Sequence, residues 1–167
     1  MRVLGVDPGT LVLGYGLIDS DRGRVAMVEC GVLTAPPRVP LGERLSYMYQ
    51  HLLEIVLQKK PDVLAVEQPF FSKNVRSAIA IGQAQAIAIL TASNNGIPVF
   101  EYPPARVKLS VAGSGTGSKE QVQIMVRLHL GLRSAPEATD ATDALAVALC
   151  HLNETHVSGL LARNKGN

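Results

Sequence analysis

The stretch MRVLGVDPGT, residues 1–10, joins a short apolar segment to an acidic turn. Val3, Leu4 and Val6 are the kind of residues that form a buried strand. A carboxylate follows at Asp7, and the Pro-Gly pair after it ends the strand. Burying a carboxylate is costly without a partner, so Asp7 is either a turn former or a functional group.

The rest of the chain predicts a single α/β domain with a mixed sheet. Short links join the first three predicted strands, which favours an antiparallel meander, and the fourth strand is apolar on both faces and therefore central. The predicted strands cover residues 2–7, 12–19, 25–33, 62–68 and 97–102. The predicted helices cover residues 41–60, 74–94, 104–112, 118–130 and 139–153. The prediction is therefore a five-stranded mixed sheet, three antiparallel strands and then parallel strands, flanked by helices.

The domain is expected to span residues 1–153, with residues 154–167 forming a polar, flexible C-terminal tail. Cys30 and Cys150 lie far apart in the sequence, which is typical of reduced thiols in a cytoplasmic protein. No signal peptide is recognisable, and no segment approaches the roughly 18 apolar residues of a membrane span. A cytoplasmic protein that does not bind membranes is therefore expected.

The second predicted helix is apolar on almost every side. Its sequence AIAIGQAQAIAIL places Ala78, Gly82 and Ala86 at four-residue steps. A helix of this kind is buried on more than one side. The second partner is either a two-fold copy of the same helix, which would make a homodimer through the region Ala78–Ala86, or other helices of the same chain.

The basic residues are concentrated in the middle of the chain. The net charge is only +2, yet residues 68–136 hold seven basic residues and two acidic ones. This distribution favours one positive face for a polyanion, and charges scattered over a solvated surface are the alternative.

Three further carboxylates share the setting of Asp7. Glu67 ends the apolar strand at residues 62–68, and Asp140 and Asp143 lie in the apolar segment ATDATDALAVAL. A spacing of three places these two aspartates on one face of the first helical turn. Each acid has a structural explanation alone: a turn, a favourable helix dipole or an ion pair with arginine. Four acids at the ends of apolar elements favour one shared site.

A shared site of four acids predicts bound divalent cations. Like charges in one pocket repel strongly unless they are neutralised, and no matching set of four cations lies near them in the sequence. Carboxylate ligands select Mg²⁺, with Mn²⁺ as a substitute, and two such ions about 4 Å apart are the usual arrangement for phosphodiester hydrolysis. An acidic metal site beside a basic face therefore predicts a nuclease.

A resemblance to a known family agrees with this prediction. The segments GVDPGT, VEQPFFSKN, VFEYPPARVK, GSGTGSKEQVQIMV and ATDATDALAVAL occur in one order from Met1 to His151, and together they resemble RuvC, the bacterial Holliday junction resolvase. The resemblance implies a ribonuclease H-like fold and a homodimer that nicks two opposed strands of a four-way DNA junction with Mg²⁺. It also implies a role in recombination and repair beside the RuvA–RuvB branch-migration complex.

The resemblance also assigns site residues. The family's catalytic and metal-binding positions fall on the same four residues, Asp7, Glu67, Asp140 and Asp143. Its DNA-stacking aromatic falls on Phe70, and its functional lysines fall on Lys108 and Lys119. The start of a helix behind a Gly-rich loop, where Lys119 lies, also suits a phosphate. Three other basic residues are candidate contacts to the DNA backbone: Lys73, Arg76 and Arg106.

Three other functions are compatible with parts of the sequence. DPGTLVLGYG also resembles the phosphate loop of the actin and sugar-kinase superfamily, but those proteins need two lobes and 167 residues make one. A ribonuclease H-like nuclease could act on RNA instead. A non-catalytic dimer that binds DNA junctions would need the carboxylates to be dispensable.

Overall fold

The structure, a computed structural model, describes residues 1–69 and 75–164, and the side chains as far as Ser158. It contains five strands: β1 (Arg2–Asp7), β2 (Val12–Asp21), β3 (Arg24–Thr34), β4 (Val63–Glu67) and β5 (Val99–Tyr102). The helices in the described ranges are α1 (Leu41–Lys59), α2 (Val75–Asn94), α3 (Pro104–Ala112), α4 (Lys119–His129) and α5 (Thr139–Asn164).

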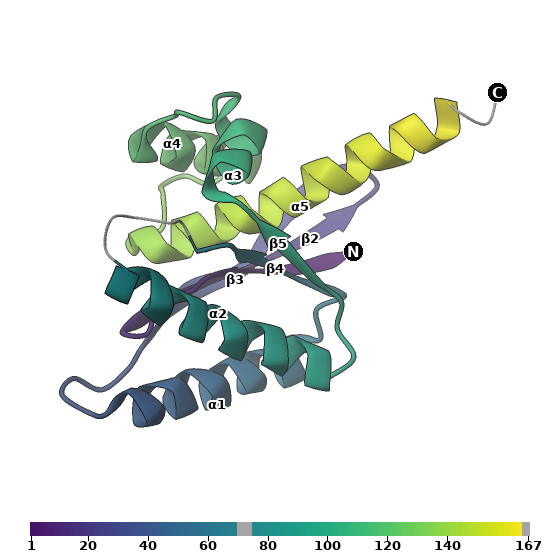
Figure 1. The fold of residues 1–167 in the computed structure, drawn as a ribbon. Helices are drawn as coiled ribbons and strands as arrows, with labels where there is room; N and C mark the ends of the chain where they lie inside the picture. Colours follow the sequence, from purple (N-terminus) through teal and green to yellow (C-terminus); the bar gives the residue numbers. More distant parts are fainter. Residues whose placement is uncertain (70–74, 165–167) are drawn as a thin grey trace.

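The strands form one sheet in the order β3-β2-β1-β4-β5. β2 pairs antiparallel with both β1 and β3, whereas β4 pairs parallel with both β1 and β5 (Figure 1). The predicted mixed sheet, with its antiparallel meander followed by parallel strands, is therefore confirmed. β1 and β4 are neighbours at the centre of the sheet, as their apolar sequences indicated.

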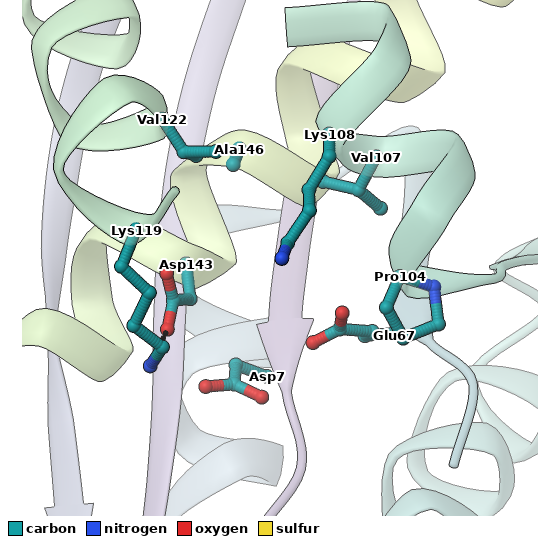
Figure 2. A pocket seen from close by; sticks show the side chains of 9 residues that line it. All are labelled: Asp7, Glu67, Pro104, Val107, Lys108, Lys119, Val122, Asp143 and Ala146. Carbon is teal, nitrogen blue, oxygen red and sulfur yellow. Dashed lines mark hydrogen bonds and ion pairs between the residues drawn. The ribbon is translucent and has the colours of Figure 1, made fainter. Parts of the chain in front are cut away.

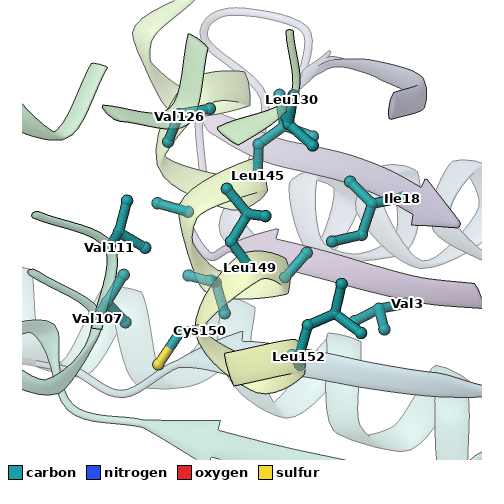
Figure 3. Packing of buried hydrophobic residues seen from close by; sticks show 14 of the residues in the cluster. Val3, Ile18, Val107, Val111, Val126, Leu130, Leu145, Leu149, Cys150 and Leu152 are labelled. Carbon is teal, nitrogen blue, oxygen red and sulfur yellow. The ribbon is translucent and has the colours of Figure 1, made fainter. Parts of the chain in front are cut away.

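Helices cover both faces of the sheet. α1 and α2 lie on one face, and α5 lies on the other with α3 and α4 beyond it (Figure 1). Because side chains alternate along a strand, each strand supplies both layers. Leu4 and Val6 of β1 pack into the layer of α1 and α2. Val3 packs into the second layer with Leu145 and Leu149 of α5 (Figure 3).

The contact between α5 and the sheet is unusually close. A Cβ atom on Gly5 would lie 2.0 Å from the carbonyl oxygen of Ala144, and one on Gly14 would lie 2.0 Å from the carbonyl oxygen of Asp140. No real Cβ tolerates such a distance, so the helix backbone rests directly on the backbones of β1 and β2. The two glycines thus set how deep, and in which register, α5 lies on the sheet.

Most helix ends in the described ranges lie within a residue or two of their predicted positions. α1 ends at Lys59, its C-cap Lys60 is left-handed with φ +50°, and Pro61 follows. Ser118 caps α4 by accepting a hydrogen bond from the Gln121 backbone, and the Gln121 side chain completes a capping box.

The predicted end of the last helix near Asn153 is wrong, because α5 continues to Asn164, about three turns further. The polar residues after Asn153 suggested a tail, but extending a helix that is already formed costs far less than starting one, and residues 160–163, Leu-Leu-Ala-Arg, are good helix formers. The division into a domain at 1–153 and a tail at 154–167 stays a prediction.

The expectation that no segment is long and apolar enough to span a membrane needs correction. By length and composition α2 is apolar enough to cross a membrane, the one such helix among residues 1–69 and 75–164. The core helix of a globular domain passes the same test. Ala84, Ala88 and Ala92 of α2 are fully buried in this domain, and Ala88 and Ala92 pack in the same layer as α1.

We expect Gly5→Ala to destabilise the protein by about 3 kcal/mol or more, because the new methyl group collides with the α5 backbone. Gly42→Ala is the matched control, since a Cβ there meets no atom of the described residues within 4 Å and alanine favours the helix. Thermal unfolding of the three proteins measures both effects. An unchanged unfolding midpoint in Gly5→Ala would contradict the packing described here.

Candidate active site

The strand register brings two of the predicted carboxylates together. β1 and β4 run parallel with Val6 opposite Val66, so Asp7 and Glu67 follow as neighbours at the same end of the sheet. Gly5 rests on α5 and Ala65 packs in the α5 layer, and Asp7 and Glu67 lie two residues further along. By the alternation of a strand, both carboxylates therefore project toward α5.

The first turn of α5 brings the aspartates to the same place. Gly14 pairs with Asp7 across β1 and β2, and the Asp140 backbone rests on Gly14. Asp143, one turn further along the helix, lies in the same cavity as Asp7 and Glu67 (Figure 2). Asp140 lies beside this cavity and does not line it, although its charge raises the pKa of Asp7.

The cavity has a volume of about 260 Å³ and opens between α3, α4 and the first turns of α5. Its lining combines three carboxylates, two lysines and an apolar wall (Figure 2). The apolar wall could not be predicted from the sequence, because alanine, valine and proline carry no chemical signal of a site. The lining residues are Asp7, Glu67, Pro104, Val107, Lys108, Lys119, Val122, Asp143 and Ala146.

The crowding of the carboxylates changes their acidity. Burial, followed by the negative charges of Glu67, Asp143 and Asp140 in that order, raises the pKa of Asp7 to about 8, against the opposing positive charge of Lys119. Burial and the charge of Asp143 raise the pKa of Glu67 to about 6, against the opposing effect of a hydrogen bond with Asp7. Near neutral pH this pocket therefore favours a proton or a bound cation on Asp7.

A lysine provides one such positive charge. The Lys119 ammonium donates to Asp143 Oδ2 at 2.9 Å, and this contact is the main cause that raises the pKa of Lys119. The lysine side chain is 65% exposed while that of Asp143 is 19% exposed, so Lys119 reaches in from solvent. One ammonium cannot neutralise all the carboxylates of the cavity.

The donor set fits a hard divalent cation. Carboxylate oxygens are the ligands that Mg²⁺ and Mn²⁺ prefer, and the raised pKa of Asp7 records how strongly this pocket favours neutralisation. Within residues 1–69 and 75–164, however, no three Asp, Glu, His or Cys side chains converge tightly enough to form a ready-made metal site.

The other predicted residues fall into three groups. Lys108 points into the cavity beside Glu67 (Figure 2). Arg76 is exposed in the first turn of α2, and Arg106 on α3 is paired with Glu154 of α5. Phe70 and Lys73 lie outside the residues that the structure describes.

Known proteins with the same sequence pattern identify the family. The model of the family described as crossover junction endodeoxyribonuclease RuvC matches residues 3–151. The chain belongs to the RuvC family. RuvC proteins are metal-dependent nucleases, which agrees with the carboxylate cavity. The RuvC of Dehalococcoides mccartyi strain BAV1 is 49% identical over 163 residues, which cover 98% of each chain. That of Chloroflexus aggregans is 48% identical over 90% of this chain and 92% of its own.

Solved structures agree with the sequence relatives. The Thermus thermophilus RuvC in complex with a Holliday junction substrate has a TM-score of 0.88 and 34% identity, and the match covers 95% of this chain and 96% of that one. The yeast mitochondrial Holliday junction resolvase, at 13% identity and a TM-score of 0.62, shares the fold. The predicted ribonuclease H-like fold of the RuvC type is therefore confirmed.

The pKa of Asp7 predicts how stability depends on pH in the absence of metal. Because this pKa is raised from 3.8 to about 8, the folded state holds a proton that the unfolded state releases. The resulting stability is present below about pH 4 and is lost as pH rises toward about 8. Thermal unfolding in EDTA should therefore show a midpoint that falls over this range, by about 2–4 °C per kcal/mol for a chain of this size.

The Asp7→Asn variant separates this effect from other titrations. It should unfold at a midpoint that falls less steeply with pH, since the amide cannot ionise, and Mg²⁺ should stabilise it less than the parent protein. Parallel pH profiles for the two proteins would show that Asp7 is not held in its protonated form.

Proposed function

We propose that the chain resolves four-way DNA junctions by nicking two opposed strands symmetrically, in recombination and repair, through two-metal-ion hydrolysis. The observation that carries this proposal is the single cavity that holds Asp7, Glu67 and Asp143 in a chain of the RuvC family. The relative from Thermus thermophilus forms a complex with a Holliday junction substrate, and its fold matches this chain closely. Action on RNA has no comparable support here.

The four carboxylates Asp7, Glu67, Asp140 and Asp143 would hold two Mg²⁺ ions, or Mn²⁺ in their place. When bound, the ions supply an activated water for attack on the phosphodiester and stabilise the leaving 3′ oxygen. Asp7 lies between Glu67 and the aspartates of α5, so it is the carboxylate best placed to serve both ions. Lys119 would have to release Asp143 for that carboxylate to hold a cation, and its exposed side chain would then be available for a phosphate.

Basic residues around the cavity would hold the DNA. Lys108 and Lys119 lie where they can contact phosphates next to the scissile one. Arg76, exposed at the start of α2, is placed for a more distant phosphate. Phe70 and Lys73 stay proposals from the sequence: an aromatic ring that stacks on an opened base step, and a backbone contact.

The proposed homodimer forms through α2. Val75, Ile79, Ala86 and Leu90 are exposed and lie on one stripe of this helix, within about 60° around its axis. Among the residues that the structure describes, a Cβ atom on Gly82 would meet only Pro69, at 3.9 Å, which leaves room for a second backbone to approach closely. Two copies related by a two-fold axis would cover this stripe and present two active sites to two strands. A cytoplasmic location and cooperation with RuvA–RuvB belong to the same proposal.

The central test is incubation of a synthetic four-way junction with the protein, with and without Mg²⁺. We expect paired nicks on opposed strands with Mg²⁺ and none in EDTA. Linear duplex and RNA hairpins of equal length are the competing substrates. Equal cutting of linear duplex or of RNA would refute the proposed specificity.

Asp143→Asn tests the role of the carboxylates. We expect junction cutting to fall by at least about 10³-fold, since the site loses a metal ligand, while junction binding persists. Metal-free stability should stay unchanged or rise, because one repelling charge is removed. Asp21→Asn at the opposite end of the sheet is the control and should cut normally. If Asp143→Asn unfolds at a much lower temperature, Asp143 has a structural role instead.

Ile79→Asp tests the proposed dimer. A charge in the apolar stripe should yield monomers in sedimentation and single nicks in place of paired ones. Leu57→Asp on α1 is the matched control, because Leu57 is as exposed as Ile79 at 56% but lies outside the stripe. A dimeric Ile79→Asp protein would place the interface elsewhere.

A further inference from the structure

α3 carries Lys108 into the active-site cavity, yet it is a helix of only nine residues. Val107 and Val111 form its buried face, and they pack in the same layer as α4 and α5 (Figure 3). Two further contacts hold its backbone: the Cys150 thiol donates to the Arg106 carbonyl at 3.9 Å, and the His129 ring lies 3.2 Å from the Val111 carbonyl. The roll of so short a helix also depends on its side-chain contacts, and this roll decides where Lys108 points.

The face of α3 next to the valines is bound to α5 through polar contacts. Arg106 donates from Nε and from a terminal nitrogen to the two carboxylate oxygens of Glu154, both at 2.7 Å. The Asn153 amide donates to the Ser110 backbone carbonyl at 3.1 Å and to its hydroxyl at 3.2 Å. We call these four residues the α3–α5 clamp.

The clamp and Lys108 lie on opposite sides of the buried face. At about 100° per residue, Arg106 and Ser110 share one side of α3, Val107 and Val111 follow, and Lys108 comes about 200° after Arg106. A roll of α3 that opens the clamp therefore moves Lys108 relative to Glu67. Because α5 also carries Asp143, the clamp fixes Lys108 to the same helix that supplies a carboxylate.

We propose that Arg106 and Glu154, together with Ser110 and Asn153, are positioning residues that set the roll of α3 and so hold Lys108 in the active site. This inference rests on the proposed role of Lys108 at the scissile strand. It gives Arg106 a different task from the DNA-backbone contact that the sequence suggested. It also gives a function to Glu154, which the sequence analysis assigned to a polar tail.

The geometry of the pair favours this role over a DNA contact. Two parallel charge-assisted hydrogen bonds fix the plane of the guanidinium, which a single contact would leave free. The negative charge of Glu154 offsets the positive charge of Arg106. A phosphate would therefore have to displace the Glu154 carboxylate in order to bind Arg106. The side chain of Arg106 is still 53% exposed, so the pair adds little to the stability of the fold and its loss leaves the protein folded.

The experiment compares Arg106→Ala, Glu154→Ala, the charge swap R106E/E154R and Lys108→Ala. Single-turnover nicking at saturating protein reports the chemical step, junction affinity in EDTA reports binding, and thermal unfolding reports folding. Asp19→Ala is the control, because it breaks the paired contact with Arg2, which has similar hydrogen-bond lengths of 2.8 Å, far from the cavity.

We expect Arg106→Ala and Glu154→Ala to slow nicking about tenfold each, as a misplaced catalytic group does, with junction affinity unchanged. The charge swap should recover most of the rate, and the Asp19→Ala control should cut normally. Recovery in the swap separates positioning from a merely structural role, because both single variants and the swap remain folded.

Two results would overturn the inference. If Arg106 contacts DNA, Arg106→Ala weakens junction binding, and the slope of log affinity against log salt concentration becomes smaller by about one. In that case Glu154→Ala binds the junction at least as tightly as the parent protein and cuts it normally. Normal cutting by both clamp variants beside a slow Lys108→Ala overturns the clamp and leaves the proposed function intact. Normal cutting by Lys108→Ala would instead remove the role of Lys108 on which the inference rests.

Discussion

The direct contact between the backbone of α5 and the glycines of β1 and β2 is the constraint on which the site depends. Without side chains at Gly5 and Gly14, the helix approaches the sheet closely enough for its first turn to lie opposite the end of β1. The aspartates of α5 thereby meet two carboxylates from strands that are remote in sequence. A helix packed at the usual distance, on larger side chains, would lie farther from the sheet and leave these groups farther apart.

That close packing brings like charges together in a buried pocket, and this repulsion favours the binding of a positive charge. Burial and like charge raise the pKa of Asp7 to about 8, so the metal-free pocket prefers to be neutralised. Lys119 supplies part of the missing charge through Asp143, from a flexible side chain at the start of α4. The proposed divalent cation would deliver two charges at one point, which the single ammonium of Lys119 cannot do.

How much the sequence could predict depended on whether a feature was local. The apolar run of β1 and the start of a helix at residue 118 are local patterns, and the structure has both where they were expected. The meeting of Asp7 with Glu67 followed from the pairing of two apolar strands. The predicted end of α5 near Asn153 was wrong, because nothing in the sequence directly after Asn153 stops the helix. The Arg106–Glu154 pair was not predicted, because its residues lie 48 positions apart in the sequence and no local pattern links them.

The two faces of the sheet have separate tasks, and the alternation of its strands links them. In β1, Val3 and Gly5 face α5 and lead to Asp7, whereas Leu4 and Val6 support the layer of α1 and α2. The candidate active site therefore lies on the face of the sheet that α5 covers, and α2 with its exposed apolar stripe lies on the other face. This separation lets an active site of crowded charges and a broad apolar surface coexist in a domain of 167 residues.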